Sequence, residues 1–216
     1  MAQPENNSAS QKGKIHWRVV GMLALILIIL PAGSWYYLTK GYNYRKELLD
    51  DLQNDLGDVE PYSLQTADGQ TYGLSDFAGN TAVVNFIGSR DLQREFIWTN
   101  LTKLHEQFDD RNDILFITHV AGDPLADLPK DTAQWKIITG TEEELQKIAV
   151  ESYNLKFPEG QTILNNSQII LLDSSRIRNY YDANDPMQMG RLLEHITIVM
   201  PRQAERDIIL ERDKEM

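Results

Sequence analysis

Two arginines one helical turn apart are the residues whose spacing best suits chemistry. Arg90 and Arg94 lie in a segment whose pattern predicts the start of a helix, so their side chains share one face. Ser89 is a suitable N-cap, and the free N–H groups of a helix N-terminus attract anions. The pattern predicts a site that binds a carboxylate of a partner protein. The alternative is surface pairing of both arginines with Asp91 or Glu95.

Metal ligands are scarce in this sequence and badly spaced. The chain has six methionines, four histidines and no cysteine. Met187 and Met189 lie two residues apart and would point to different sides of a helix. His195 stands among apolar neighbours, as a histidine at the edge of a core does. His105 and His119 have no acidic or cysteine cluster at a spacing typical of zinc. We therefore expect no metal site and no cofactor.

No sequence pattern of a known catalytic site is present. The chain has no G-x-S-x-G, no H-E-x-x-H and no phosphate-binding loop. The acidic run Glu142–Glu144 is explained by the preference for acidic residues at the start of a helix. Asp109 and Asp110 fit a loop that follows a helix. Because no nucleophile has a base at a suitable spacing, we expect a protein that is not an enzyme and has no catalytic residues.

One long apolar stretch, residues 19–38, predicts a transmembrane helix. At about 1.5 Å per residue it spans a bilayer core of roughly 30 Å. Lys12, Lys14 and Arg18 precede it, which favours a cytoplasmic N-terminus and an outer domain that faces the periplasm of a bacterial inner membrane. The alternative is a signal peptide cleaved near Ala32–Ser34.

The chain beyond this stretch is acidic. Residues 41–216 contain 17 of the 21 lysines and arginines and 31 of the 32 aspartates and glutamates, a formal net charge of −14. Such a domain is repelled by nucleic acids and suits a basic partner protein. The alternative is that the charge serves solubility alone.

Apolar periodicity predicts strands that alternate with helices. Thr141 and Glu144 form a capping box at the start of one helix. A second helix, residues 91–108, has an apolar stripe of Leu92, Phe96, Leu101, Leu104 and Phe108. The order of elements predicts an α/β three-layer domain with a mixed central sheet. The expected elements are a stalk helix over 41–58 that ends at Gly57; strands at 63–66, 71–74, 81–87, 113–120, 135–139, 168–173 and 177–181; and helices at 91–108, 141–153 and 187–200.

The expected organisation has five segments. They are a disordered cytoplasmic tail (1–18), the transmembrane helix (19–38), a stalk (39–59), the three-layer domain (60–200) and a charged C-terminal tail (201–216). The C-terminal tail alternates charges around one apolar group, Ile208, Ile209 and Leu210. These three side chains are candidates for binding, either to this domain or to another chain.

The sequence resembles the Sco/SenC family, thioredoxin-like proteins that deliver copper to cytochrome c oxidase. The resemblance covers roughly residues 60–200 and is carried by five stretches. They are Leu74–Asn80, Val83–Ile87, Thr139–Gly140, Ile170–Asp173 and Tyr180–Asp182. It implies a thioredoxin-like fold held at a membrane by one helix.

The departures from the family fall on its copper ligands. The places of the family's two Cys-x-x-x-Cys cysteines correspond to Arg90 and Arg94, and Glu95 stands where a proline is usual. The place of the family's histidine corresponds to Asn165 or its neighbour Asn166. Arginine stays cationic and only donates hydrogen bonds, so this set does not suit copper.

The resemblance and the residues together predict an accessory or structural protein of the respiratory chain. It would bind cytochrome c oxidase, its assembly machinery or a cysteine-bearing Sco-like protein, without redox or metal chemistry. The alternative is a copper chaperone that uses a different site or the cysteines of a partner.

Overall fold

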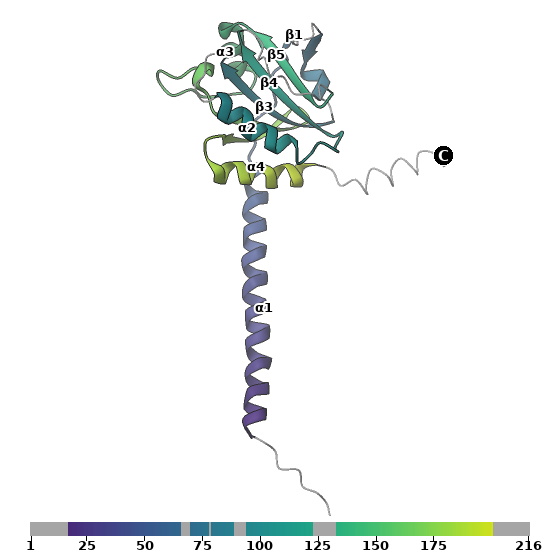
Figure 1. Cartoon of the computed structure of the whole chain (residues 1–216), viewed down its shortest axis with the longest axis vertical. Helices are drawn as coiled ribbons and strands as arrows, with labels where there is room; N and C mark the ends of the chain where they lie inside the picture. Colours follow the sequence, from purple (N-terminus) through teal and green to yellow (C-terminus); the bar gives the residue numbers. More distant parts are fainter. Residues whose placement is uncertain (1–16, 66–69, 78, 89–93, 123–132, 201–216) are drawn as a thin grey trace, which may run out of the picture. The chain divides into compact units, whose positions relative to one another are not determined.

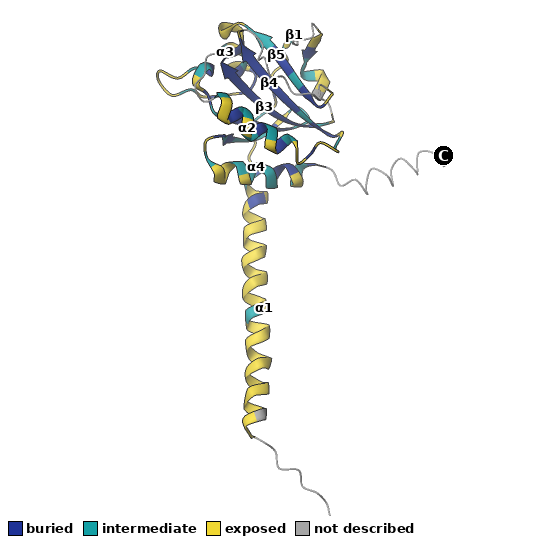
Figure 2. Ribbon diagram, in the orientation of Figure 1, coloured by how far each residue is buried: buried dark blue, intermediate teal, exposed yellow. Residues whose placement is uncertain are grey.

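The computed structural model describes residues 17–65, 70–77, 79–88, 94–122 and 133–200. The chain divides into two compact units, Met1–Glu47 and Leu48–Met216. All described residues of the first unit belong to helix α1, Trp17–Asp51 (Figure 1). This helix is long and apolar enough to cross a membrane, with a mean hydropathy of 1.8 in its most apolar window. Its side chains are almost all exposed (Figure 2), as expected of a segment that lipid would surround.

The end of α1 differs from the expected separate stalk helix. A single helix runs through the predicted span and ends at Asp51, six residues before Gly57. The N–H groups of Leu52 and Gln53 bond to carbonyls three residues back, at 3.2 and 3.1 Å, which tightens and closes the last turn. Gly57 has a φ of +88°, so it forms a bend in the chain that follows the helix.

The second unit is built on a five-stranded mixed sheet, as the sequence predicts. The strand order is β5-β4-β3-β6-β7. The three strands β3, β4 and β5 are parallel, and β6 and β7 are antiparallel to their neighbours. The bounds are β3 Thr81–Gly88, β4 Ile114–Ala121, β5 Trp135–Gly140, β6 Gln168–Asp173 and β7 Arg176–Asp182.

Helices cover both faces of this sheet, which confirms the three-layer architecture. Helices α2 (Arg94–His105) and α4 (Pro186–Val199) pack on one face, and α3 (Glu142–Glu151) packs on the other. Alternate residues of β3 enter the two cores, so the strand is buried along its whole length (Figure 2). The remaining elements are strands β1 (Ser63–Gln65) and β2 (Thr71–Gly73), which form a hairpin, and the short 3-10 helices η1 (Leu74–Phe77) and η2 (Ile163–Asn165).

The helix caps follow the sequence closely. Thr141 is the N-cap of α3 and forms the predicted capping box with Glu144. In α4 the N-cap is Asp185, whose side chain accepts a hydrogen bond from the N–H of Met187, and Pro186 occupies the first turn. Each of these helices therefore starts within one residue of its predicted place.

The apolar stripe predicted for α2 is partly wrong. Ile97, Leu101 and Leu104 are buried, whereas Phe96 is 49% exposed. The spacing of 97, 101 and 104 places those three side chains on one side of the helix, and Phe96 lies about 100° away around the axis. Leu92 lies outside the described residues.

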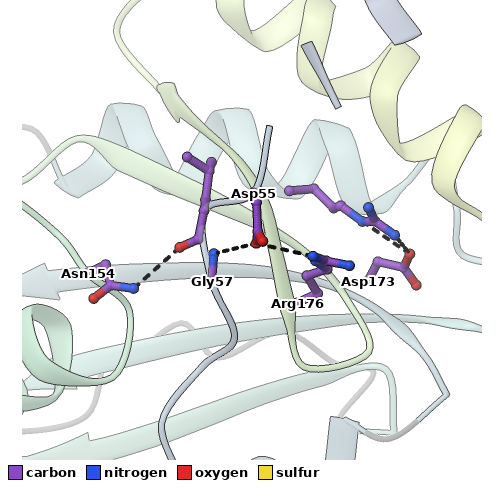
Figure 3. A network of polar contacts seen from close by, with 7 residues as sticks. Asp55, Gly57, Asn154, Asp173 and Arg176 are labelled. Carbon is purple, nitrogen blue, oxygen red and sulfur yellow. Dashed lines mark hydrogen bonds and ion pairs between the residues drawn. The ribbon is translucent and has the colours of Figure 1, made fainter. Parts of the chain in front are cut away.

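The segment that follows α1 is held along the first half of β7 (Figure 3). Asp55 accepts hydrogen bonds from Gly57 N–H at 3.2 Å and pairs with Arg176 at 3.1 Å. Gly57 O accepts from Ile177 N–H at 2.9 Å, and Val59 N–H donates to Ser175 O at 2.8 Å. These bonds cover the start of an edge strand.

The second half of β7 is covered by side chains. Tyr180 and Asp182 alternate with the residues that bond to β6, so their N–H groups face away from the sheet. Asn179 Oδ1 accepts from Tyr180 N–H at 2.9 Å, and Gln188 Oε1 accepts from Asp182 N–H at 2.8 Å.

Candidate functional site

The candidate site lies where β3 ends and α2 begins. β3 stops at Gly88 and α2 starts at Arg94, so the family's cysteine places fall in and beside the connection. Arg94 is half-buried at the first residue of the helix and is engaged in an interaction within the chain. Arg90 lies outside the described residues, and its pairing with Arg94 stays a prediction.

The segment that carries Asn165, the 3-10 helix η2, packs against the end of β3. A Cβ added to Gly88 would lie 2.8 Å from Leu164 Cα and 2.7 Å from its Cδ2. Only glycine therefore fits at Gly88 while η2 keeps this position. The fold thus brings the Asn165 segment to the carboxyl end of β3.

The two asparagines of this segment are turned toward their own backbone. Asn165 is exposed, and its Oδ1 accepts a hydrogen bond from Thr162 N–H at 2.9 Å, which caps η2. Asn166 is buried, and its Oδ1 accepts from Gln168 N–H at 3.1 Å. Both oxygens serve local turns and are not directed at a shared ligand.

These residues do not fit a copper ion. Copper in this fold would need soft or imidazole donors. The chain supplies no cysteine, and the positions in question carry guanidinium, amide and, at Leu164, aliphatic groups. Within the described parts of the chain no group of three or more histidine, aspartate or glutamate side chains is placed to hold a metal.

The other candidate metal ligands do not converge either. Met187 is 84% exposed, while His195 is fully buried in the same helix. His195 Nδ1 lies 2.6 Å from the hydroxyl of Tyr181, and its burial lowers its pKa. His195 is a core histidine, as the sequence predicts, although it sits inside the core and not at its edge.

A buried polar cluster on the α3 side was not predicted. The hydroxyl of Tyr62 lies 3.1 Å from His119 Nε2 and within hydrogen-bond distance of the hydroxyl of Tyr153. The imidazole of His119 stacks on Phe86 with 4.4 Å between ring centroids. Burial lowers the pKa of His119 to about 3 and raises the pKa of both tyrosines. The three groups are neutral at physiological pH and are joined through the hydroxyl of Tyr62.

A second buried chain of hydrogen bonds crosses three strands on the α2 side. Trp135 Nε1 donates to Thr118 Oγ1 at 2.9 Å, and that hydroxyl donates to Asn85 Oδ1 at 2.8 Å. All three side chains are at most 2% exposed. Neither the buried polar cluster nor this row of hydrogen bonds offers a nucleophile to solvent. Both therefore contribute to the stability of the sheet.

Comparison with solved structures identifies the fold. A SCO1/SenC family lipoprotein from Bacillus anthracis has a TM-score of 0.55 and 20% identity, over 68% of this chain and 98% of that chain. BsSco, a member of the Sco family of cytochrome c oxidase assembly proteins, has a TM-score of 0.53 and 19% identity, over 68% and 96%. A putative thiol:disulfide interchange protein DsbE from Chlorobium tepidum has a TM-score of 0.52 and 13% identity, over 68% and 97%.

The chain therefore has the thioredoxin-like fold of Sco/SenC proteins, and the resemblance predicted from the sequence is confirmed at the level of the fold. No family model matches the sequence, and no curated protein matches it.

Proposed function

We propose that this chain is a divergent Sco/SenC-like protein that binds other proteins and carries out no thiol or metal chemistry. The observation that carries the proposal is the combination of a Sco-like fold with a chain that has no cysteine. A thiolate is the nucleophile of thiol exchange and a soft copper ligand. A protein that keeps the fold without a thiolate can still act by binding other proteins through its surface.

The proposed place of action is cytochrome c oxidase or its assembly. The support is BsSco, whose structure shares this fold and which is a member of the Sco family of cytochrome c oxidase assembly proteins. We propose a permanent or transient partner among the oxidase subunits or a cysteine-bearing Sco-like protein. The −14 charge of residues 41–216 favours a basic contact surface on that partner.

The proposed location is a bacterial inner membrane crossed once by α1. The helix has the required length and apolar character. Lys12, Lys14 and Arg18 precede its apolar part, which favours a cytoplasmic N-terminus and a periplasmic domain.

The proposed contact on this chain is the pair Arg90 and Arg94 at the start of α2. Two guanidinium groups beside a helix N-terminus suit a carboxylate of the partner. The described neighbours of this connection are Gly88, at the end of β3, and Leu164, which packs against it.

The test is recovery of partners from the protein's own membrane. Full-length tagged protein is purified in mild detergent and the recovered chains are identified by mass spectrometry. We expect stoichiometric oxidase subunits or assembly proteins. The double variant Arg90→Ala with Arg94→Ala should lower recovery about tenfold or more, because charged hydrogen bonds are lost.

The matched control removes two exposed cations elsewhere, Lys147→Ala with Lys156→Ala, and should leave recovery unchanged. Equal loss in both double variants would show that net charge, and not this site, determines binding. Tight stoichiometric binding of Cu(I) or Cu(II) by the purified chain would contradict the proposal and favour the alternative, a copper chaperone.

A further inference from the structure

Helices α2 and α4 form an apolar groove on the outside of the domain. The groove has a volume of about 410 Å³ and lies between the two helices. Its walls include Phe96, Leu104, Met189 and Leu193, with Lys103 and Gln107 beside them. Phe96, a large aromatic residue turned away from the core, is 49% exposed here.

An exposed apolar groove is a place where another segment can bind. Four large hydrophobic side chains are exposed among the described residues from Leu48 onward: Leu49, Phe96, Val150 and Met187. Two of them, Phe96 and Met187, belong to the helices that form the groove. The exposed ring of Phe96 thus lies in an apolar groove of the second unit.

We propose that the groove binds the C-terminal tail of the same chain, through Ile208, Ile209 and Leu210. Residues 201–216 lie outside the described residues, and their attachment point is fixed. Met200 caps α4, with its N–H bonded to Ile196 O at 2.9 Å. The tail therefore begins at the end of one of the two helices that line the groove.

The length of the tail suffices to reach the groove. Leu193 lies seven residues before Met200 and Pro186 lies fourteen before it, about 10 and 21 Å back along the helix. The eight residues from Pro201 to Ile208 span up to roughly 26–29 Å when extended. The apolar group can thus reach any point of the groove along α4.

Charge and tethering both favour this occupant. Asp207 and Glu211 flank the apolar group, and Lys103 stands in the wall of the groove, so a carboxylate of the tail has a cationic partner. A tethered segment has an effective local concentration in the millimolar range. A free partner at micromolar concentration competes poorly with it for the same apolar surface. Of the two binding modes that the sequence leaves open for the tail, the structure favours its own domain.

The absence of cysteine makes the test direct, because introduced thiols are the only ones in the chain. Full-length protein in detergent micelles carries Glu211→Cys together with Gln107→Cys in the groove. Glu211→Cys leaves the apolar group intact, and Gln107 is exposed, so the fold is not disturbed. The matched control pairs Glu211→Cys with Lys147→Cys, which is exposed on α3 over the opposite core.

We expect an intramolecular disulfide in the groove pair about tenfold faster than in the control pair, because docking raises the local concentration of one thiol. A further substitution, Ile209→Asp, should bring the groove pair down to the control rate. Equal rates in the two pairs would overturn the proposal. Disulfide-linked dimers whose rate rises with protein concentration would also overturn it, since a second copy would then be the occupant. Neither readout depends on oxidase binding, so this proposal and the proposed function fail separately.

Discussion

Thr118→Val should destabilise the domain strongly although it preserves shape. The hydroxyl of Thr118 accepts a hydrogen bond from Trp135 Nε1 and donates one to Asn85 Oδ1, in a layer of the sheet where all three side chains are at most 2% exposed. Valine replaces the hydroxyl with a methyl group. Both neighbours then stay buried without this partner.

The magnitude follows from the two groups left without a partner. An unsatisfied buried donor or acceptor costs about 1–3 kcal/mol, so the loss of both bonds lowers the free energy of unfolding by roughly 2–6 kcal/mol. Thr118→Ser keeps the hydroxyl and removes one methyl group, for which about 1 kcal/mol is expected. The difference between the two variants isolates the hydrogen bonds from the packing.

The assay is urea unfolding of the full-length protein in mild detergent, followed by tryptophan fluorescence. With a slope of about 2 kcal/mol per M, the midpoint for Thr118→Val should fall by roughly 1–3 M and that for Thr118→Ser by about 0.5 M. The reasoning would be refuted if valine left the midpoint within 0.3 M of wild type by such a measurement, or if serine were as harmful as valine.

Three further outcomes are expected. Gly88→Ala should lower the free energy of unfolding by about 1–3 kcal/mol, because its Cβ meets η2 at under 3 Å. The control Gly190→Ala, in open space on α4, should raise the free energy of unfolding by up to about 1 kcal/mol. Thermal unfolding compares the two variants, and equal effects would contradict the close approach of Gly88 to η2. Burial holds the pKa of His119 at about 3, below its unfolded value, so the stability from the neutral ring is present above about pH 6.5 and is lost as the pH falls toward 3. Between pH 7 and pH 5 the wild type should lose about 2 kcal/mol that the variant His119→Gln does not lose, and parallel urea curves for the two proteins would count against this. Thr141→Ala should cost about 1 kcal/mol through loss of the N-cap of α3, whereas Glu143→Ala, outside the capping box, should change little in the same thermal assay.

Elements with strong local signals could be predicted from the sequence. The buried strand β3 is a continuous β-branched run, and α3 starts at a capping box, so both lie within a residue or two of their predicted places. The length and apolar composition that would let α1 cross a membrane can be read from the sequence in the same way.

The parts that depend on distant residues could not be predicted. Tyr62 and His119 are 57 positions apart in the chain, and nothing in either neighbourhood indicates that their side chains meet. Phe96 has the spacing of a core residue, and only the rotation of α2 against the sheet decides that Ile97 is buried in its place. The closeness of Gly88 to Leu164 is likewise a result of tertiary packing.

The covered edge of β7 limits how this protein can assemble with anything else. The addition of a strand to a sheet edge requires outward N–H and carbonyl groups in register. In β7 the N–H groups of Tyr180 and Asp182 already donate to amide side chains. Residues 57–59 run along the start of the strand. A second β-strand, whether from a neighbouring copy or an unfolded chain, has no backbone template on that side. The domain can therefore be crowded without growing a continuous intermolecular sheet from β7, and any partner that approaches there must recognise side chains.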